Sequence, residues 1–323
     1  MPPVTRTLRR ALAGLWRADR LLTAVGLVML AALAASLAGL WLDPRTITGA
    51  PAWLKPAKFA ASIAIYTFTL AWIFRYLPDW TRTRRAVSRI TATVMLLELA
   101  IIDVQAWRGT TSHFNAGTPL DATLFTIMGV GIVFQTLTSI AVAVALWRQQ
   151  FADAALGRAL RLGLALTIAG AFTGGLMTRP TAAQLAEARA TGRLAVAGAH
   201  TVGASDGGAG LPGTGWSREH GDLRVAHFIG LHAVQVLPLI ALALRRRVPD
   251  ASRARLTAIA AGSYAGIFGI LLWQALRGQS VIAPDAATLA ALAAWLAATA
   301  GAVWLASGRR ARLASLTHSV AAP

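Results

Sequence analysis

The sequence predicts an all-α integral membrane protein with eight transmembrane helices, and three observations support this fold class. The chain has 323 residues, of which 56% are hydrophobic and only 14% charged, whereas soluble domains carry roughly 25% charged residues. Its apolar residues form eight separate runs, each close to the ~20 residues that a helix needs to cross a bilayer. These runs show no alternation of polar and apolar residues, which argues against the strands of a membrane barrel.

The eight predicted spans follow one another with short connections, except for one long connection at residues 179–223. The first span follows an arginine-rich segment, and its apolar run is too long for a signal peptide, so we expect it to be retained. We divide the chain into an N-terminal segment (1–20), two four-helix units (21–147 and 148–306) and a tail (307–323). The spans are predicted at residues 21–42, 57–76, 88–107, 122–147, 158–178, 224–244, 255–276 and 285–306.

Basic residues predict the orientation of these spans. The net charge is +18, and 21 of the 31 basic residues lie on the side that holds both termini. Positive residues favour the cytoplasmic side, so we expect a multi-pass protein of the bacterial inner (plasma) membrane with both termini in the cytoplasm. The densest basic clusters, such as Arg245–Arg247, adjoin spans. They therefore indicate topology signals or contacts with anionic lipids of the bilayer, not nucleic-acid binding.

An internal repeat is visible at an offset of 169 residues. Residues 105–109 (QAWRG) recur as residues 274–278 (QALRG), and residues 55–59 (KPAKF) align in the same register with residues 224–228 (RVAHF). Because each half has an even number of spans, the pattern predicts a parallel 4+4 duplication with a site near the junction of the two units. The last span is rich in small residues and is predicted to be a packing interface, either within the chain or in a homo-oligomer.

Polar residues inside predicted spans are candidates for function because they are costly in lipid. In the sixth span, Arg224, His227, His232 and Gln235 fall on one helix face just after Asp222, and Pro238 is expected to kink the helix below them. His227 and His232 are five residues apart, so they diverge by about 140° on an unbroken helix and would not chelate one ion together.

Two further spans carry polar stripes. In the second span, Lys58 and Tyr66 share a face, and Lys55 and Lys58 are the only two lysines of the chain. They either extend to the membrane interface or bind a substrate. In the third span, Glu98 lies near the middle of the membrane with Gln105 on the same face and Arg108 one turn further out. Glu98 is either paired with a buried partner or carries a proton or cation.

Five of the six histidines lie on the predicted outer side, including His113 and His200 in connections. The long connection is glycine-rich and is either an ordered lid or a flexible loop. The chain has no cysteine, which excludes disulfides, thiolate nucleophiles, cysteine-ligated metals and covalently attached haem. Any metal ion (Fe, Cu or Zn) or haem therefore needs His or carboxylate ligands.

These features leave three functional classes. The first is a membrane enzyme with an outward His/carboxylate site, a metal- or haem-dependent oxidoreductase that acts on a small or lipid-soluble substrate. The second is a transporter or channel with a path past Glu98 between the repeats, and the third is a structural subunit. The candidate residues are, for catalysis, His227, His232, Glu98 and His113; for substrate binding, Lys55, Lys58, Tyr66, Gln105, Arg108, Arg224 and Gln235; for metal, His113, His200, His227, His232 and Asp222.

Three stretches, KPAKF (55–59), SHFN (112–115) and DLRVAHFIGLHAVQ (222–235), resemble a group of bacterial multi-span membrane proteins of uncharacterised function. The resemblance implies a multi-span membrane fold and no reaction. The predicted two-unit architecture is also similar to that of haem A synthases. Their paired helix histidines and their cysteine motif have no counterpart in this chain, so that resemblance implies nothing about function.

Overall fold

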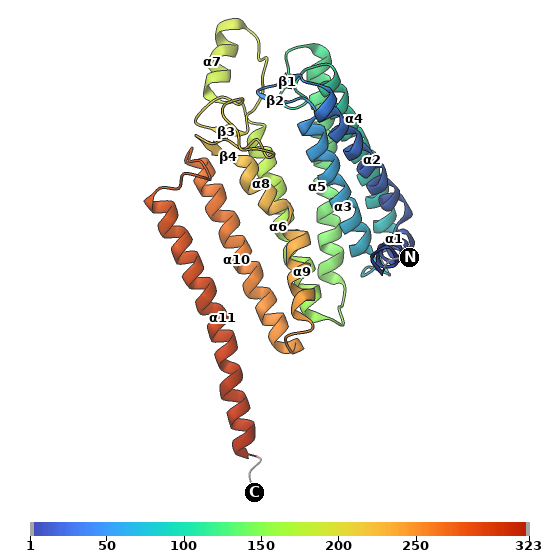
Figure 1. Ribbon diagram of the computed structural model, residues 1–323, viewed down its shortest axis with the longest axis vertical. Coiled ribbons are helices and arrows are strands. Elements are labelled where there is room, and N and C mark those ends of the chain that lie inside the picture. Colours follow the sequence, from blue (N-terminus) through green and yellow to red (C-terminus); the bar gives the residue numbers. More distant parts are fainter. Residues whose placement is uncertain (1–2, 321–323) are drawn as a thin grey trace.

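The computed structural model describes residues 3–320, which form long helices lying side by side, with one long connection folded at one end (Figure 1). Two antiparallel strand pairs, β1 (Thr46–Ile47) with β2 (Ala50–Pro51) and β3 (Thr201–Val202) with β4 (Gly221–Asp222), lie in connections. The helices are α1 (Pro3–Ala18), α2 (Arg20–Leu42), α3 (Leu54–Phe74), α4 (Thr81–Trp107), α5 (Pro119–Arg148), α6 (Ala154–Met177), α7 (Ala182–Thr191), α8 (Leu223–Leu231), α9 (Ala233–Leu244), α10 (Asp250–Leu276) and α11 (Ala286–Val320).

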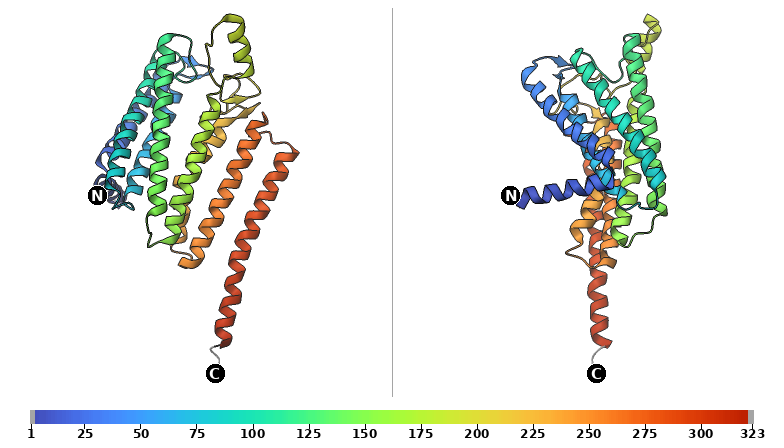
Figure 2. Two further views of the ribbon diagram at one scale, coloured as in Figure 1. Left: turned by 180° about the vertical axis from the view of Figure 1, so that it is seen from behind. Right: turned by 90° about the vertical axis from the view of Figure 1, so that its right-hand side faces the viewer.

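The two ends of the bundle differ in the segments that they hold. The loop end holds the two strand pairs and α7, and the basic end holds α1 together with the α3–α4, α5–α6 and α9–α10 connections. In side view, α1 lies across the direction of the other helices (Figure 2). The predicted N-terminal segment therefore contains a helix of its own.

The fold is all-α, with the long apolar helices of a multi-span membrane protein. Within the described residues, six helical segments are long and apolar enough to cross a membrane, or seven when the bent pair α8–α9 is counted as one span. The eight predicted spans are thus matched only in part, because α4 is not among these segments. This helix starts with four arginines in its first nine residues and carries Glu98 and Asp103 further along.

The packing of the helices divides the bundle into two groups that meet at α5 and α6. In the first group, α2 packs against α3, and α4 packs against α3 and α5. In the second group, α6 packs against α8, α9 and α10, while α11 lies against α10. The α5–α6 contact joins the groups. Along α11, Leu289, Leu296 and Trp304 are exposed, so this helix leaves an apolar face open to lipid or to another chain.

The same turn closes α4 and α10, the helices that end in the repeated QA-x-RG sequence. Gln105 and Gln274 are both buried, and each donates a side-chain hydrogen bond to the carbonyl oxygen six residues later, at 3.4 and 2.9 Å. Gly109 and Gly278 follow with φ of 74° and 73°, a left-handed conformation that glycine adopts at no steric cost.

The arginine within each of these turns also has an equivalent partner. It pairs with an aspartate near the start of the next helix, Arg108 with Asp121 and Arg277 with Asp285. The two sequence repeats therefore form turns of matching geometry.

The helix predicted over residues 224–244 breaks at His232, where α8 and α9 meet at 45°. The break lies six residues before Pro238, where we expected the kink, and Pro238 itself is inside α9. Thr167 of α6 explains the position of the break. Its hydroxyl accepts a hydrogen bond from the Val234 N–H (3.2 Å) and donates one to the Leu231 carbonyl (3.1 Å), so it satisfies backbone groups that the break would otherwise leave unpaired.

Helices α6 and α8 touch through glycine. A Cβ atom built on Gly170 would lie 2.6 Å from the Cα of Gly230, closer than real side chains approach. Both positions therefore require glycine, because any side chain would force the helices apart.

We expect Gly170→Ala to lower the free energy of unfolding by about 1–3 kcal/mol, the usual cost of overpacking. Gly175→Ala on the same helix is the matched control, since a Cβ there meets no atom within 4 Å. Reversible denaturation in detergent micelles, followed by circular dichroism, measures both variants. Equal effects of the two substitutions would contradict the proposed helix contact.

Candidate functional site

Ionisable side chains from five separate segments converge at the loop end. They come from the first turn of α3, the outer half of α4, the α4–α5 connection, the long connection after α7, and α8. The charges and rings of this set act on one another electrostatically, so they lie near one another in space. The set comprises Lys55, Lys58, Glu98, His113, His200, Asp206, Arg224 and His227.

Glu98 and His113 form the centre of this set. The His113 Nε2 lies 3.6 Å from Oε1 of Glu98, and Glu98 is only 3% exposed. Among the residues that the structure describes, Oε1 of Glu98 has no hydrogen-bond partner. A buried carboxylate oxygen without a partner is costly, so this atom is poised to interact with a ligand or a proton.

Aromatic rings enclose the His113 imidazole. Its centroid is 5.5 Å from Phe59, 6.2 Å from Phe114 and 6.4 Å from Phe125, and Nδ1 is 3.2 Å from the Ser112 hydroxyl. The imidazole is therefore held in one orientation with Nε2 facing Glu98.

Lys55 lies beside the same pair. Its Nζ is 5.8 Å from the centre of the Phe59 ring, and its charge acts on Glu98 and on Asp206. The ammonium group thus provides positive charge next to a carboxylate whose Oε1 has no hydrogen-bond partner in the described part of the chain.

The long connection is ordered over this cluster and is fixed by the two other cations. Lys58 donates a hydrogen bond to the Thr214 carbonyl (2.8 Å), and Arg224 donates one to the Gly215 carbonyl (2.6 Å). Arg224 also pairs with Asp222, whose carboxylate caps α8 and accepts the Ser217 N–H. These bonds hold the connection in a defined conformation, whereas a role as a lid stays a prediction.

His200 and Asp206 form a second pair within the connection. Their side chains meet at 2.8 Å, and Asp206 also accepts the backbone N–H groups of His200 and Thr201. Burial opposes ionisation of Asp206, but these hydrogen bonds outweigh it and hold the pKa of Asp206 below its ordinary value. Burial lowers the pKa of His200 despite the bond to Asp206, so a neutral imidazole faces a carboxylate.

His227 reaches the cluster from α8 across the glycine contact. Its Nδ1 lies 2.8 Å from the Gly170 carbonyl and 3.1 Å from the Thr173 hydroxyl. Because a carbonyl only accepts, we assign the proton to Nδ1, which leaves Nε2 as an acceptor. His232, by contrast, lies at the helix break against Phe228, with 4.3 Å between ring centroids.

Two predicted substrate-binding residues have partners within the protein. Gln105 and Arg108 both bond to Oδ1 of Asp121, at 2.8 and 2.7 Å, and Thr118 bonds to the other carboxylate oxygen. These contacts fix the α4–α5 turn beside His113, which gives both residues a positioning function in this structure.

A smaller layer of polar side chains lies between the two helix groups, further from the loop end than the cluster around Glu98. Tyr66 accepts a hydrogen bond from Gln135 (2.9 Å) and lies 3.4 Å from the Ser139 hydroxyl. Gln235 of α9 donates to Thr69 of α3 at 3.3 Å. Gln135 was not among the predicted site residues, although an amide side chain in the middle of an apolar span indicates a candidate for function.

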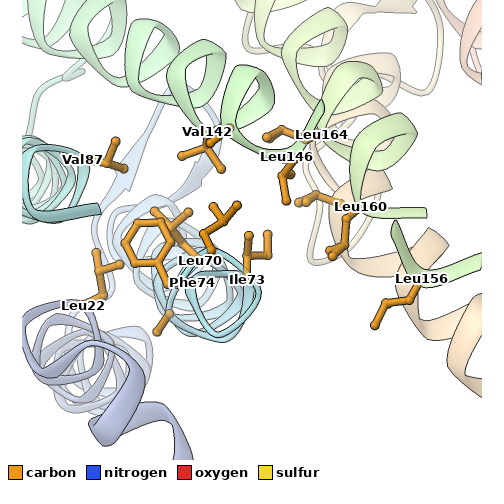
Figure 3. Close-up of a cluster of buried hydrophobic side chains, with 14 residues drawn as sticks. Leu22, Leu70, Ile73, Phe74, Val87, Val142, Leu146, Leu156, Leu160 and Leu164 are labelled. Carbon is orange, nitrogen blue, oxygen red and sulfur yellow. The ribbon is translucent and has the colours of Figure 1, made fainter. Parts of the chain in front are cut away.

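Below this layer the helix junction is apolar. Side chains from α3, α5 and α6 fill it (Figure 3), including Leu70, Phe74, Val142, Leu146 and Leu160, each at most 3% exposed. The polar residues of the cluster and of this layer therefore end above the apolar junction.

A metal centre is not evident in the part of the chain that the structure describes, where no group of three His, Asp or Glu side chains is arranged to hold an ion. Of the predicted donors, Asp222 is already paired with Arg224, whereas His113, His200 and His227 share the cluster.

The fold and this site define a multi-span α-helical membrane protein with a buried cluster of imidazole, carboxylate and ammonium groups at one end. Comparisons with protein-family models, with curated proteins and with solved structures find no match to the chain. The resemblances noted in the sequence therefore stay predictions.

We expect the contribution of His113 and His200 to the free energy of unfolding to fall as the pH is lowered from 7 to 5. Burial, aided by the charge of Lys55, holds the pKa of His113 well below its ordinary value, and burial also lowers the pKa of His200. A histidine with a lowered pKa contributes stability above its unfolded value of about 6.5, and this contribution is lost as the pH falls.

Thermal unfolding measured across this pH range tests the expectation. The His113→Gln variant removes one of the titrating groups, so the stability of the unmodified protein relative to this variant should fall toward pH 5. A relative stability that stays constant or rises toward pH 5 would contradict the assignment.

Proposed function

We propose that the chain is an integral-membrane enzyme whose active site is the outward-facing cluster around Glu98 and His113. The single observation that carries this proposal is the convergence of ionisable groups from five segments above an apolar junction. An enzyme site needs access from one side only, and the polar residues around this cluster end above the apolar junction. A small or lipid-soluble substrate fits a site that is enclosed by spans and a lid.

The roles follow from the chemistry of the side chains. Glu98 and His113 act as the acid/base pair, because an unpartnered carboxylate faces an imidazole nitrogen at 3.6 Å. Lys55 holds an anionic or polar group of the substrate, and the free Nε2 of His227 accepts a proton or binds an electrophile. Lys58 and Arg224 hold the lid by their bonds to the backbone of the long connection.

The finer architecture is also part of the proposal. Eight spans result when α4 and the α8–α9 pair are added to the candidate segments, as their packing among the other helices supports. The matching turns after α4 and α10 support a duplicated 4+4 origin. With the arginines at the basic end, the positive-inside rule places both termini in the cytoplasm of a bacterial cell.

Right-side-out membrane vesicles that contain the protein provide the main test. They are incubated with the small molecules and lipids extracted from the host cell, and mass spectrometry follows every compound. An enzyme consumes one compound and forms another. We expect Glu98→Gln to slow this conversion by about 100-fold or more, the typical contribution of a general acid or base.

Asp103→Asn is the matched control because it makes the same chemical change on the same helix outside the cluster. It should leave the conversion unchanged. A compound that enters the vesicle lumen without chemical change would contradict the enzyme and support a transporter. The absence of any converted compound relative to vesicles without the protein would also contradict the proposal.

A transporter is the second candidate, and the deeper polar layer favours it. Tyr66, Gln135 and Gln235 lie between the two helix groups, where transporters with repeated units bind their substrates. Transport would require the apolar junction around Phe74 to open toward the basic end. The vesicle experiment separates this function from catalysis.

We further propose that any redox chemistry at this site depends on a metal ion or haem bound by histidine, with His113, His200 and His227 as donors. Their shared position in the cluster supports this choice. Elemental analysis and optical spectra of the purified protein, before and after reduction, are the test. We expect bound Fe, Cu or Zn at near one atom per chain, and its loss in the His113→Gln variant. Protein without these metals and with an unchanged spectrum would contradict metal dependence.

A further inference from the structure

A second cluster of charge lies at the opposite end of the bundle, in the corner between α1, α2 and α4. The corner forms an open surface hollow of about 380 Å³. Its lining includes four arginines, Arg17, Arg20, Arg85 and Arg89, together with Trp16 and Ser88. None of these residues belongs to the site around Glu98.

The backbone of this corner is held in place by hydrogen bonds. Arg84 of α4 donates to the Ala18 carbonyl at the end of α1 (2.7 Å). Asp19 caps α2 by accepting the Leu22 N–H (2.9 Å), and its other carboxylate oxygen accepts the Ser88 hydroxyl (2.6 Å). The hollow is therefore a fixed feature, and both oxygens of its one acidic residue are already engaged.

The four arginines are exposed, and within the described part of the chain none of them has an ion-pair partner. Four like charges around one hollow repel each other, so a bound anion would relieve an existing repulsion. Arginine is also the side chain that best matches a phosphate group, through its planar array of donors.

Apolar surface continues from the hollow along α1. Trp16 and Leu21 are each 42% exposed at its edge, and a second hollow of about 470 Å³ follows, lined by Leu12, Ala13 and Trp16 with Arg9 and Arg17. Since α1 lies across the spans (Figure 2), this surface runs along the membrane boundary. A ligand that fits both parts has a phosphate head and an apolar chain.

We propose that this corner is a binding site for the phosphate headgroup of an anionic phospholipid of the surrounding leaflet. The arginines bind the phosphate, and the acyl chains lie along the apolar edge formed by Trp16 and Leu21. A soluble phosphate ester shares the headgroup chemistry but lacks the part that contacts this edge.

Lipid binding to the delipidated full-length protein, measured by native mass spectrometry, tests the proposal. The probes are phosphatidylglycerol and phosphatidylcholine with the same acyl chains, and glycerol 3-phosphate as the soluble competitor. We expect phosphatidylglycerol to bind at least tenfold more tightly than phosphatidylcholine. The double variant Arg85→Gln/Arg89→Gln should weaken its binding about 30-fold, since each arginine near a lipid surface contributes about a factor of five.

The matched control is Arg245→Gln/Arg246→Gln, which removes the same charge from exposed arginines at the same end of the bundle. It should bind phosphatidylglycerol like the unmodified protein. If Arg85→Gln/Arg89→Gln does not fold, as judged by circular dichroism, Arg17→Gln/Arg20→Gln takes its place and should show the same loss.

Three results would overturn the proposal. Equal losses in the site and control variants would show general attraction of anionic lipid to the basic end. Equal binding of the two lipids would exclude a headgroup site. Competition by glycerol 3-phosphate at the concentration at which phosphatidylglycerol binds would assign the hollow to a free phosphate ester instead of a lipid.

Discussion

The backbone contact between Gly170 and Gly230 is the constraint on which the site depends. It lets α8 lie directly against α6, so that the His227 ring reaches the Gly170 carbonyl and is fixed with one nitrogen free. One turn further along, Thr167 satisfies the backbone where α8 ends, which lets the helix change direction at His232.

The cations around the site serve two different purposes. Lys58 and Arg224 each donate one hydrogen bond to a backbone carbonyl of the long connection, so both cations hold the lid. Lys55 has no such bond among the described residues and faces Glu98. The lid is therefore held by hydrogen bonds from charged side chains. Water that enters beneath the lid would weaken these bonds.

Sequence patterns predicted much of this arrangement, and the misses have physical reasons. Apolar runs predicted the long helices because burial in lipid dominates their composition, and the rarity of lysine and the clustering of histidine predicted the residues that converge. The break at His232 was not predictable, because it depends on a threonine from another helix. The position of α1 likewise depends on a contact between segments distant in the chain, and the pairing of Arg108 with Asp121 depends on how the α4–α5 connection folds. Glu98 and His113 were individually recognisable, but only the folded connection sets their separation.

The apolar junction around Phe74 and Leu146 has an electrical consequence. It separates the ionisable groups of the loop end from the water at the basic end, and none of its buried residues is titratable. In the proposed reaction, a proton taken up or released by Glu98 or His113 would therefore exchange with the water at the loop end. Only the part of the transmembrane field between Glu98 and the loop end would act on such a proton, so the membrane potential would affect the proposed acid/base chemistry through that part alone.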